Sequence, residues 1–416
     1  MTPCGRHRTR RERKGGERVN LKAALEIMSR NDPKAAHAAP AAPAPTACWE
    51  RTGMFGPGDF AGARDLRADT LSLIQPGDWP DPVDPERICF LDTETTGLAG
   101  GAGTVVFEIG LGRLTAEGYA VTQLVMRDYP EERLLLRRTA EIIAQSDIIC
   151  TFNGRTFDLP LLQSRFLMNR MNPSVLDRPH LDLITAARRV YRLRLGSCRL
   201  QDLEREALGI RRSGDLPGSE APKRFFEYLR TGRFSLLEDV LRHNMQDIAS
   251  LCLLLIHLAK VYDEPERLSH GEDLYGMGAG LHRDRREPEA RRCWRLVRAG
   301  RMRPASRLQL ARSCRSAGDR AEAARLWREM IDRREGGVQP YIELAKHCEH
   351  AERDIPAALR YTRQALILLA EPALGTNRSV QETKNALQYR YARLTRKLRE
   401  QAERQAAEDR RENDRP

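Results

Sequence analysis

The chain has 416 residues and a mass of 47.3 kDa, which exceeds a comfortable single core and favours two or three domains. Hydrophobic residues make up 41% and charged residues 31%, with a mean hydropathy of −0.57, as in a soluble globular protein. The longest apolar stretch, residues 248–258, is too short to cross a bilayer, so no membrane partner is predicted. Seventy Lys and Arg against 58 Asp and Glu give a net charge of +12, which is compatible with a polyanionic partner.

Nine cysteines are scattered along the chain without a CxxC pair, and most have apolar neighbours. This usage is typical of buried free thiols in a reducing compartment. The Arg-rich start contains no apolar stretch of the kind found in secretory signals. We therefore expect a cytoplasmic protein.

The first 86 residues are expected to lie outside the main folded domains. Residues 1–50 combine a basic head, with nine Lys and Arg against three Glu in the first 30 positions, and an Ala/Pro tract. Such a segment cannot offset the entropy of ordering its backbone, which predicts a disordered arm. Residues 51–86 are rich in Gly and Pro and are interpreted as a linker and lead-in.

From residue 87 to residue 262 the pattern alternates between strand-like and helix-like segments. Apolar runs predict strands, listed by sequence as ICFLDTE, TVVFEIGLGRL, YAVTQLVMR and DIICTFN. Helical spacing of apolar residues is found at 131–144, 159–170, 181–191, 200–207, 224–230 and 235–262. This order predicts an α/β domain, with helices flanking a mixed sheet.

Residues 274–400 are helical in pattern and repetitive, and residues 401–416 form a charged tail. Trp294, Trp327 and Tyr361 recur at intervals of 33 and 34, each with an alanine four residues earlier. This is the period of tetratricopeptide repeats, in which stacked helix pairs bury the apolar faces that one pair would expose. A generic array of helical hairpins is the alternative.

Three separate segments of the α/β domain each supply acidic residues at the end of an element. Asp92 and Glu94 are two apart on a strand and therefore share a face, Asp158 opens a helix, and His243 and Asp247 are one helical turn apart. Each group alone has an ordinary explanation, as a helix cap, a residue favoured by the helix dipole, or a surface contact. Taken together they predict a cluster of carboxylates, whose mutual repulsion a divalent cation would relieve.

The acidic segments resemble the three exonuclease motifs of the DEDD superfamily on a ribonuclease-H-like fold, and most closely the YprB-like group. The matching segments are LDTETTGLAGGAGTVVFEIGLGR, TFNGRTFDLPLLQSRF, HLDLITAARRVY, GDLPGSEAPKRFFEYLRTG and HNMQDIASL. The resemblance covers residues 87–262, and helical repeats behind the domain also suit that group. One departure concerns the last motif. Exonucleases of this superfamily usually carry a His five residues, or a Tyr four residues, before the final Asp, whereas His243 is four residues before Asp247.

The resemblance implies a 3′→5′ exonuclease that hydrolyses RNA or DNA with two divalent cations, Mg²⁺ or Mn²⁺. It implies that Asp92 bridges both cations, that Glu94 and Asp247 complete the one beside the attacking water, and that Asp158 holds the other. His243 would act as general base or orient the water.

Further residues have weaker support as substrate contacts. Thr95 and Thr96 precede a Gly-rich loop that can either approach a nucleotide or simply form a turn. Asn153 can contact substrate or terminate its strand, whereas Asp182 is expected to cap or pack its helix. Residues 214–222, GDLPGSEAP, match the family pattern without a role that chemistry suggests.

Two functions from different classes are compatible with the sequence. The first is the metal-dependent nuclease. The second is a catalytically weak or inactive nuclease-like scaffold that binds nucleic acid or a protein partner through its helical repeats. Because all four carboxylates are present, the enzyme is favoured.

Overall fold

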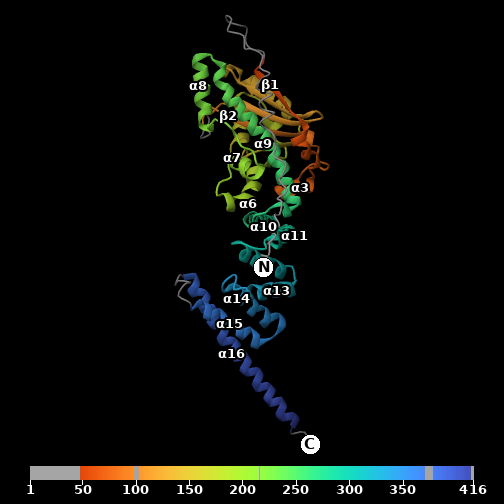
Figure 1. The fold of residues 1–416 in the computed structure, drawn as a ribbon, viewed down its shortest axis with the longest axis vertical. Coiled ribbons are helices and arrows are strands. Elements are labelled where there is room, and N and C mark those ends of the chain that lie inside the picture. Colours follow the sequence, from red (N-terminus) through yellow and green to blue (C-terminus); the bar gives the residue numbers. More distant parts are fainter. Residues whose placement is uncertain (1–46, 98–102, 215, 371–377, 414–416) are drawn as a thin grey trace, which may run out of the picture. The chain divides into compact units, whose positions relative to one another are not determined.

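The computed structural model describes residues 47–97, 103–214, 216–370 and 378–413, and the chain divides into two compact units, residues 1–267 and 268–416 (Figure 1). Nearly all of the expected N-terminal arm lies outside the described residues. All eight cysteines within them are buried free thiols, as predicted.

The first unit is built on a six-stranded mixed sheet, which confirms the predicted fold class. Its strands are β1 (Trp49–Phe55), β2 (Ile88–Thr95), β3 (Val106–Thr115), β4 (Gly118–Val125), β5 (Ile148–Thr151) and β6 (His180–Asp182). They lie in the order β1-β4-β3-β2-β5-β6. Neighbours from β1 to β2 are antiparallel, whereas β2, β5 and β6 run parallel.

Two of these strands were not expected from the sequence. Strand β1 falls where the sequence suggested an arm and a linker, yet it pairs with β4 along its whole length, from Trp49 opposite Val125 to Phe55 opposite Tyr119. It is an edge strand with alternating half-buried and exposed side chains, so it lacks a continuous apolar run. Strand β6 has three residues, too few to show any period.

Helices follow the predicted segments closely. Those of the first unit are α2 (Pro57–Phe60), α3 (Ala68–Ile74), α4 (Glu132–Ile143), α5 (Asp158–Met168), α6 (Leu183–Leu195), α7 (Leu200–Leu203), α8 (Ala221–Thr231) and α9 (Glu238–Asp263). Five residues of π-helix, Glu204–Leu208, extend α7. The segment 57–74, expected as linker, instead contributes α2 and α3, which contact α9.

Helices cover both faces of the sheet. Alternate residues of β2, such as Cys89 and Leu91, share one core cluster with apolar side chains of α4, α5 and α8. Phe90 points to the other face, where its ring contacts Tyr119, and Tyr119 donates a hydrogen bond from its hydroxyl to the carbonyl of Ile248 in α9. Because side chains alternate along a strand, Asp92 and Glu94 lie on the same face as Phe90, under α9.

Helix α9 approaches β3 so closely that two strand positions have no room for a side chain. A Cβ atom at Gly110 would overlap the side chain of Asn244, and one at Gly112 would overlap Tyr119 and Ile248. These glycines therefore set the distance between helix and sheet.

One helical stretch, residues 234–263, is long and apolar enough to cross a membrane by length and composition. Within the first unit it is 83% buried over its most apolar window, and it contacts β2, β3 and β4. Its apolarity is that of a core helix packed on a sheet.

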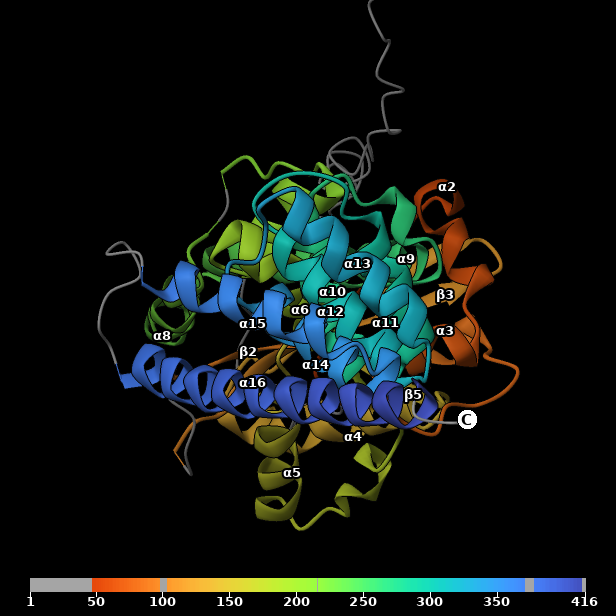
Figure 2. The same ribbon diagram turned by 90° about the horizontal axis from the view of Figure 1, so that it is seen from below.

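The second unit is helical throughout its described residues. Its helices are α10 (Gly271–Arg283), α11 (Glu287–Leu296), α12 (Arg303–Ser316), α13 (Arg320–Asp332), α14 (Gln339–His347), α15 (Ile355–Leu369) and α16 (Arg378–Asn413). Successive helices pack as hairpins, and α16 runs beside α15 (Figure 2). Trp294 and Trp327 are fully buried, and Gly278 lies against the indole of Trp294. Helix α16 extends through most of the predicted tail.

We expect Gly110→Ala to destabilise the first unit by ~1–3 kcal/mol, because the added methyl group must push Asn244 and α9 away from the sheet. Urea denaturation followed by circular dichroism measures the change. The matched control is Gly58→Ala in α2, where a Cβ atom meets nothing within 4 Å. Equal stability of the two variants would contradict the proposed role of Gly110 as a spacer.

Candidate active site

Two carboxylates project from the end of β2 under α9. Asp92 and Glu94 are partly exposed, whereas Thr93 and Thr95 between and after them are buried. Burial raises the pKa of Asp92 well above its usual range, and the carboxylates of Asp247 and Asp158 raise it further. The pKa of Glu94 is also well above its usual range, first because of burial and then because of Asp92. Asp92 and Glu94 are therefore surrounded by other carboxylates that repel their negative charge.

Asp158 joins this group from the first residue of α5. Its carboxylate is buried and accepts a hydrogen bond of 2.5 Å from the hydroxyl of Thr93. Burial raises the pKa of Asp158 to about 6, although the bond from Thr93 opposes the shift. Thr93 thus connects the second acidic segment to the first.

Helix α9 brings the third segment against β2. Asn244 donates a hydrogen bond of 3.0 Å from its side-chain amide to Oδ2 of Asp92. Asp247, three residues later, raises the pKa of both Asp92 and Glu94 through its charge. The structure therefore brings all four predicted carboxylates into one electrostatically coupled cluster.

A buried arginine neutralises one member of the cluster. Arg212, in the loop after the π-helical turn, donates to both carboxylate oxygens of Glu204 at 2.6 Å and also to Oδ1 of Asp247. Its Nη1 lies 3.3 Å from Nδ1 of His243, and Nε2 of His243 lies 3.5 Å from Oδ2 of Asp247. Since a guanidinium only donates, Nδ1 of His243 accepts and the ring carries its proton on Nε2.

A fifth acid lies beside the cluster on the neighbouring strand. Glu108 is opposite Glu94 in the β2–β3 register and is fully buried. Burial raises the pKa of Glu108 to about 8, against the opposing effects of Arg51 and of a 2.9 Å hydrogen bond from Gln123. The same amide nitrogen of Gln123 also donates to the carbonyl of Leu241 at 2.6 Å, so the acid is tied to α9.

The donor set fits hard divalent cations, but one of its members is engaged. Carboxylate oxygens are the ligands that Mg²⁺ and Mn²⁺ prefer, and a cation would oppose both the burial and the neighbouring carboxylates that raise the pKa of Asp92 and Glu94. Within the described ranges, no three His, Cys, Asp or Glu side chains are grouped so that they could hold a metal ion. To bind a metal ion, Asp247 would have to give up its hydrogen bond from Arg212.

The remaining predicted residues have local roles in the structure. The Thr95 hydroxyl donates to the carbonyl of Gly97, and the Thr96 hydroxyl accepts from the backbone of Val105, so both hold the turn. Asn153 follows β5 in a left-handed conformation with a φ of 69°. Asp182 caps α6 through the backbone nitrogen of Ile184, which confirms the expected capping role.

Four site residues were missed by sequence reasoning: Glu108, Asn244, Glu204 and Arg212. Two of them carry a signal in the sequence. Glu108 is an acid inside the apolar run TVVFEIGLG, and Asn244 lies within the HNMQD segment. Arg212 is one of many arginines in a basic chain, and nothing local marks it or Glu204.

Residues 89–259 match the RNase_H superfamily. A curated protein of Bacillus subtilis (strain 168), "Uncharacterized protein YprB", is 31% identical over 320 residues, which cover 75% of each chain. The chain belongs to the YprB family within the RNase_H superfamily. Proteins of that superfamily are generally hydrolytic nucleases that use divalent metals, so nuclease chemistry is the activity that membership suggests.

Among solved structures, the family B DNA polymerase from the archaeon Pyrobaculum calidifontis is similar at 17% identity and a TM-score of 0.35. The match covers 50% of this chain and 30% of the polymerase. A likeness of this size carries no functional argument.

We expect Asp92→Asn to stabilise the metal-free protein, increasingly so as the pH rises. Asp158 and Glu108, with pKa values of about 6 and about 8, contribute stability that is fully present in acid and lost as the pH passes through those values. Removing the Asp92 charge relieves the repulsion that develops there. Thermal melts in chelating buffer between about pH 5 and about pH 8 measure the difference in Tm from the parent.

The control for this measurement is Asp147→Asn. Its hydrogen-bonded partner Arg87 lowers the pKa of Asp147, so this group contributes stability that is lost on acidification, the opposite sign. A Tm advantage of Asp92→Asn that does not grow with pH would contradict the repulsion argument.

Proposed function

We propose that the protein is a divalent-metal-dependent 3′→5′ exonuclease of the DEDD type, acting on RNA or DNA. The observation that carries the proposal is the convergence of three separate segments at the end of β2, where the charges of Asp158 and Asp247 raise the pKa of both Asp92 and Glu94. Ordinary protein folding gains nothing from such repulsion. A site for cations explains it, and superfamily membership supports the same chemistry.

In this proposal, each residue of the site has a defined task. Asp92, Glu94, Asp158 and Asp247 hold two divalent cations, which would stabilise the charge on the attacking and leaving oxygens of a phosphodiester. Asn244 orients Asp92, and Thr93 orients Asp158, through the hydrogen bonds described above. Thr95, Thr96 and Asn153 border the same sheet edge and are proposed to contact the substrate through their backbone or side chains.

His243 requires a change of partner before it can act on water. Its Nδ1 lies against Arg212 and its Nε2 faces Asp247, so both ring nitrogens are engaged. Displacement of Arg212 from Asp247 and His243 would free Nδ1, the ring nitrogen that can accept a proton. We therefore propose that His243 would act as the base, or orient the water, in a form of the site in which a cation stands in place of Arg212 at Asp247.

The contact of Arg212 with Asp247 is also the observation that favours the second function. A guanidinium that supplies the missing positive charge makes a closed, metal-free site stable. A catalytically weak scaffold would keep this arrangement permanently. Its binding surface would be the helical unit, for which a tetratricopeptide-like array and a protein partner remain our proposal, based on the spacing of Trp294, Trp327 and Tyr361.

We expect the protein to degrade labelled single-stranded RNA or DNA in Mn²⁺ or Mg²⁺, and Asp92→Asn to reduce this to the background seen in chelator. Strands labelled at the 5′ or the 3′ end distinguish the direction, since a 3′→5′ exonuclease releases a 3′ label in the first step. Gel electrophoresis of the products provides the measurement.

The matched control is Asp147→Asn, which removes a half-buried carboxylate that pairs with Arg87 and lies outside the cluster. It should cleave like the parent. Binding of nucleic acid without cleavage in either metal, by parent and control alike, would favour the scaffold over the enzyme.

We further expect His243→Ala to lower the cleavage rate by roughly 10²–10⁴-fold, the usual loss for a general base. His243→Tyr should recover part of the rate, because a phenol at that helical position can hold the same water by a hydrogen bond. Titration with Mn²⁺ should show nearly unchanged affinity in His243→Ala but weakened affinity in Asp247→Asn. Equal weakening in both would make the imidazole a metal ligand instead.

A further inference from the structure

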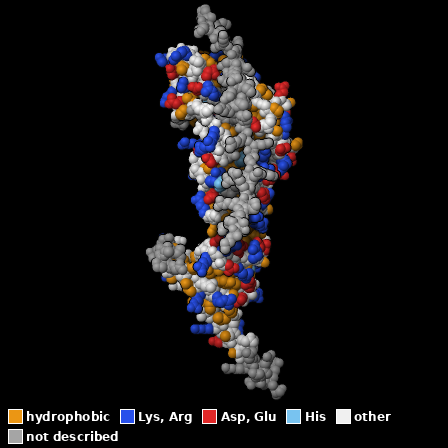
Figure 3. Space-filling model, viewed as in Figure 1, with side chains coloured by type: hydrophobic (Ala, Val, Ile, Leu, Met, Phe, Trp, Pro, Cys, Tyr) orange, Lys and Arg blue, Asp and Glu red, His pale blue; other side chains and the backbone are white. Residues whose placement is uncertain are grey.

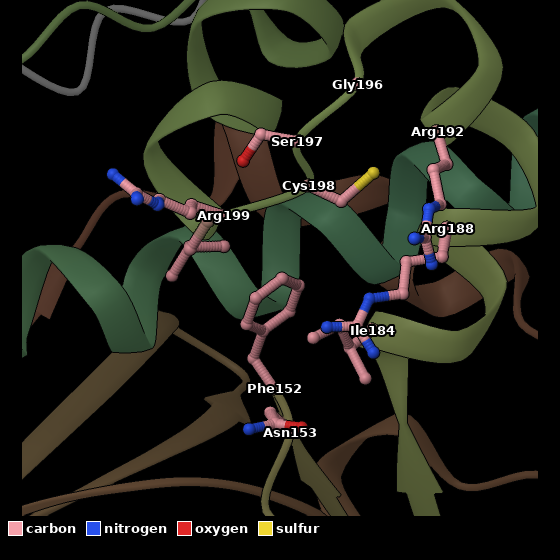
Figure 4. A pocket seen from close by; sticks show the side chains of 10 residues that line it. Phe152, Asn153, Ile184, Arg188, Arg192, Gly196, Ser197, Cys198 and Arg199 are labelled. Carbon is pink, nitrogen blue, oxygen red and sulfur yellow. The ribbon is translucent and has the colours of Figure 1, made fainter. Parts of the chain in front are cut away.

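The first unit contains a hollow of about 560 Å³ whose lining includes none of the four carboxylates. It lies between the exit of β5, the outer side of α6 and the loop into α7 (Figure 4). Its lining includes Phe152, Asn153, Arg188, Arg192, Ser197 and Arg199. This volume falls in the range of about 300–1,000 Å³ that is usual for small-molecule sites.

Three cationic side chains line this hollow without an anionic partner. Arg188, Arg192 and Arg199 are exposed, and no side-chain hydrogen bond or ion pair joins any of them to another residue that the structure describes. Arg188 and Arg192 are one helical turn apart on α6, and Figure 4 shows both side chains running down the same side of the hollow. Like charges at this spacing repel, so an anion between them would be stabilising.

An aromatic ring and an amide complete the lining. Phe152 is half-buried and presents its ring to the hollow opposite α6 (Figure 4). The side-chain oxygen of Asn153 accepts from Thr156 at 3.1 Å. A phenyl ring beside guanidinium groups matches the chemistry of single-stranded nucleic acid, in which bases stack on aromatic side chains and phosphates contact arginines.

The position of the hollow connects it to the carboxylates. Strands β2 and β5 run parallel and pair from Ile88 opposite Ile148 to Phe90 opposite Cys150. Asp92 and Phe152 therefore leave the sheet at the same edge, two residues beyond the last of these pairs. The loop from Asn153 leads directly into Asp158. A nucleic-acid strand cleaved at the carboxylates would therefore pass beside this hollow.

We propose that the hollow is a subsite for one nucleotide of a single-stranded substrate, with phosphate held by Arg188 and Arg192 and the base against Phe152. Arg199 on the opposite side would contact the next phosphate. The inference rests on the proposed nuclease function and assigns to it a single-stranded substrate that is gripped beside the site of cleavage.

On the face drawn in Figure 3, the surface charges form no comparable site for phosphate groups. There, Lys and Arg side chains alternate with Asp and Glu over the described residues. Many arginines among the described residues are already paired, as Arg138 is with Glu50 and Glu141. Unpaired arginines that face a cavity and an aromatic ring are therefore a distinct feature.

The test measures binding of a short 5′-fluorescein single-stranded DNA by fluorescence anisotropy in EDTA, at several salt concentrations. Arg188→Gln/Arg192→Gln should weaken binding and flatten the plot of log affinity against log salt by about 0.7, the contribution of the one phosphate that both arginines hold. Phe152→Leu should weaken binding without changing the slope, because stacking involves no counterion. Circular dichroism checks that each variant is folded.

The matched control is Arg133→Gln/Arg137→Gln on α4. These arginines have the same spacing and are exposed, with no ion pair to another described residue, but they do not line the hollow. This pair should leave the slope unchanged. Equal flattening in both double variants would overturn the subsite, and so would displacement of the DNA by inorganic tripolyphosphate with the affinity of the oligonucleotide itself.

Because binding is measured without metal, its result is separate from cleavage. If the protein degrades DNA but the two double variants have the same salt slope, the proposed function stands and the subsite is wrong. If the salt slopes differ but the protein does not cleave, the single-strand subsite stands and the nuclease function is wrong.

Discussion

Helix α9 lies so near β3 that Gly110 and Gly112 face it with no side chain between. The contact places Asn244 against Asp92 and brings the charge of Asp247 to the end of β2. A helix held even one methyl group farther away would separate these segments. The cluster of carboxylates thus depends on an absence of side chains at two positions of β3, a strand that supplies none of the four carboxylates.

The site combines buried acids with a single strong internal cation. Arg212 binds Glu204 and Asp247 together, whereas Asp92 accepts a hydrogen bond from the uncharged amide of Asn244. Arg212 therefore places a positive charge beside Asp247, whereas Asn244 brings none to Asp92. Under the proposed function, this asymmetry would let the metal-free protein fold while leaving Asp92 and Glu94 to be neutralised by a cation.

Much of the first unit could be predicted from the sequence because its central strands are buried on both faces and its helices are strongly periodic. Strand β1 could not, because half of its side chains are exposed and its partner β4 is remote in the sequence. The four carboxylates were predicted from the order of their motifs. Arg212 was not, since its importance comes from long-range contacts with Glu204 and Asp247 and no local pattern distinguishes one arginine among many.

Asp182 connects the two parts of the proposed machinery through a single side chain. Its carboxylate accepts from the backbone nitrogens of Asn153 at 2.7 Å and Arg155 at 3.1 Å, and it caps α6 at Ile184. The loop that leads to Asp158 and the helix that carries Arg188 are thereby fixed to one anchor. Under the proposed function, this shared anchor would keep the arginine hollow at a constant distance from the carboxylates, so that a bound strand would place the same bond at the carboxylates each time.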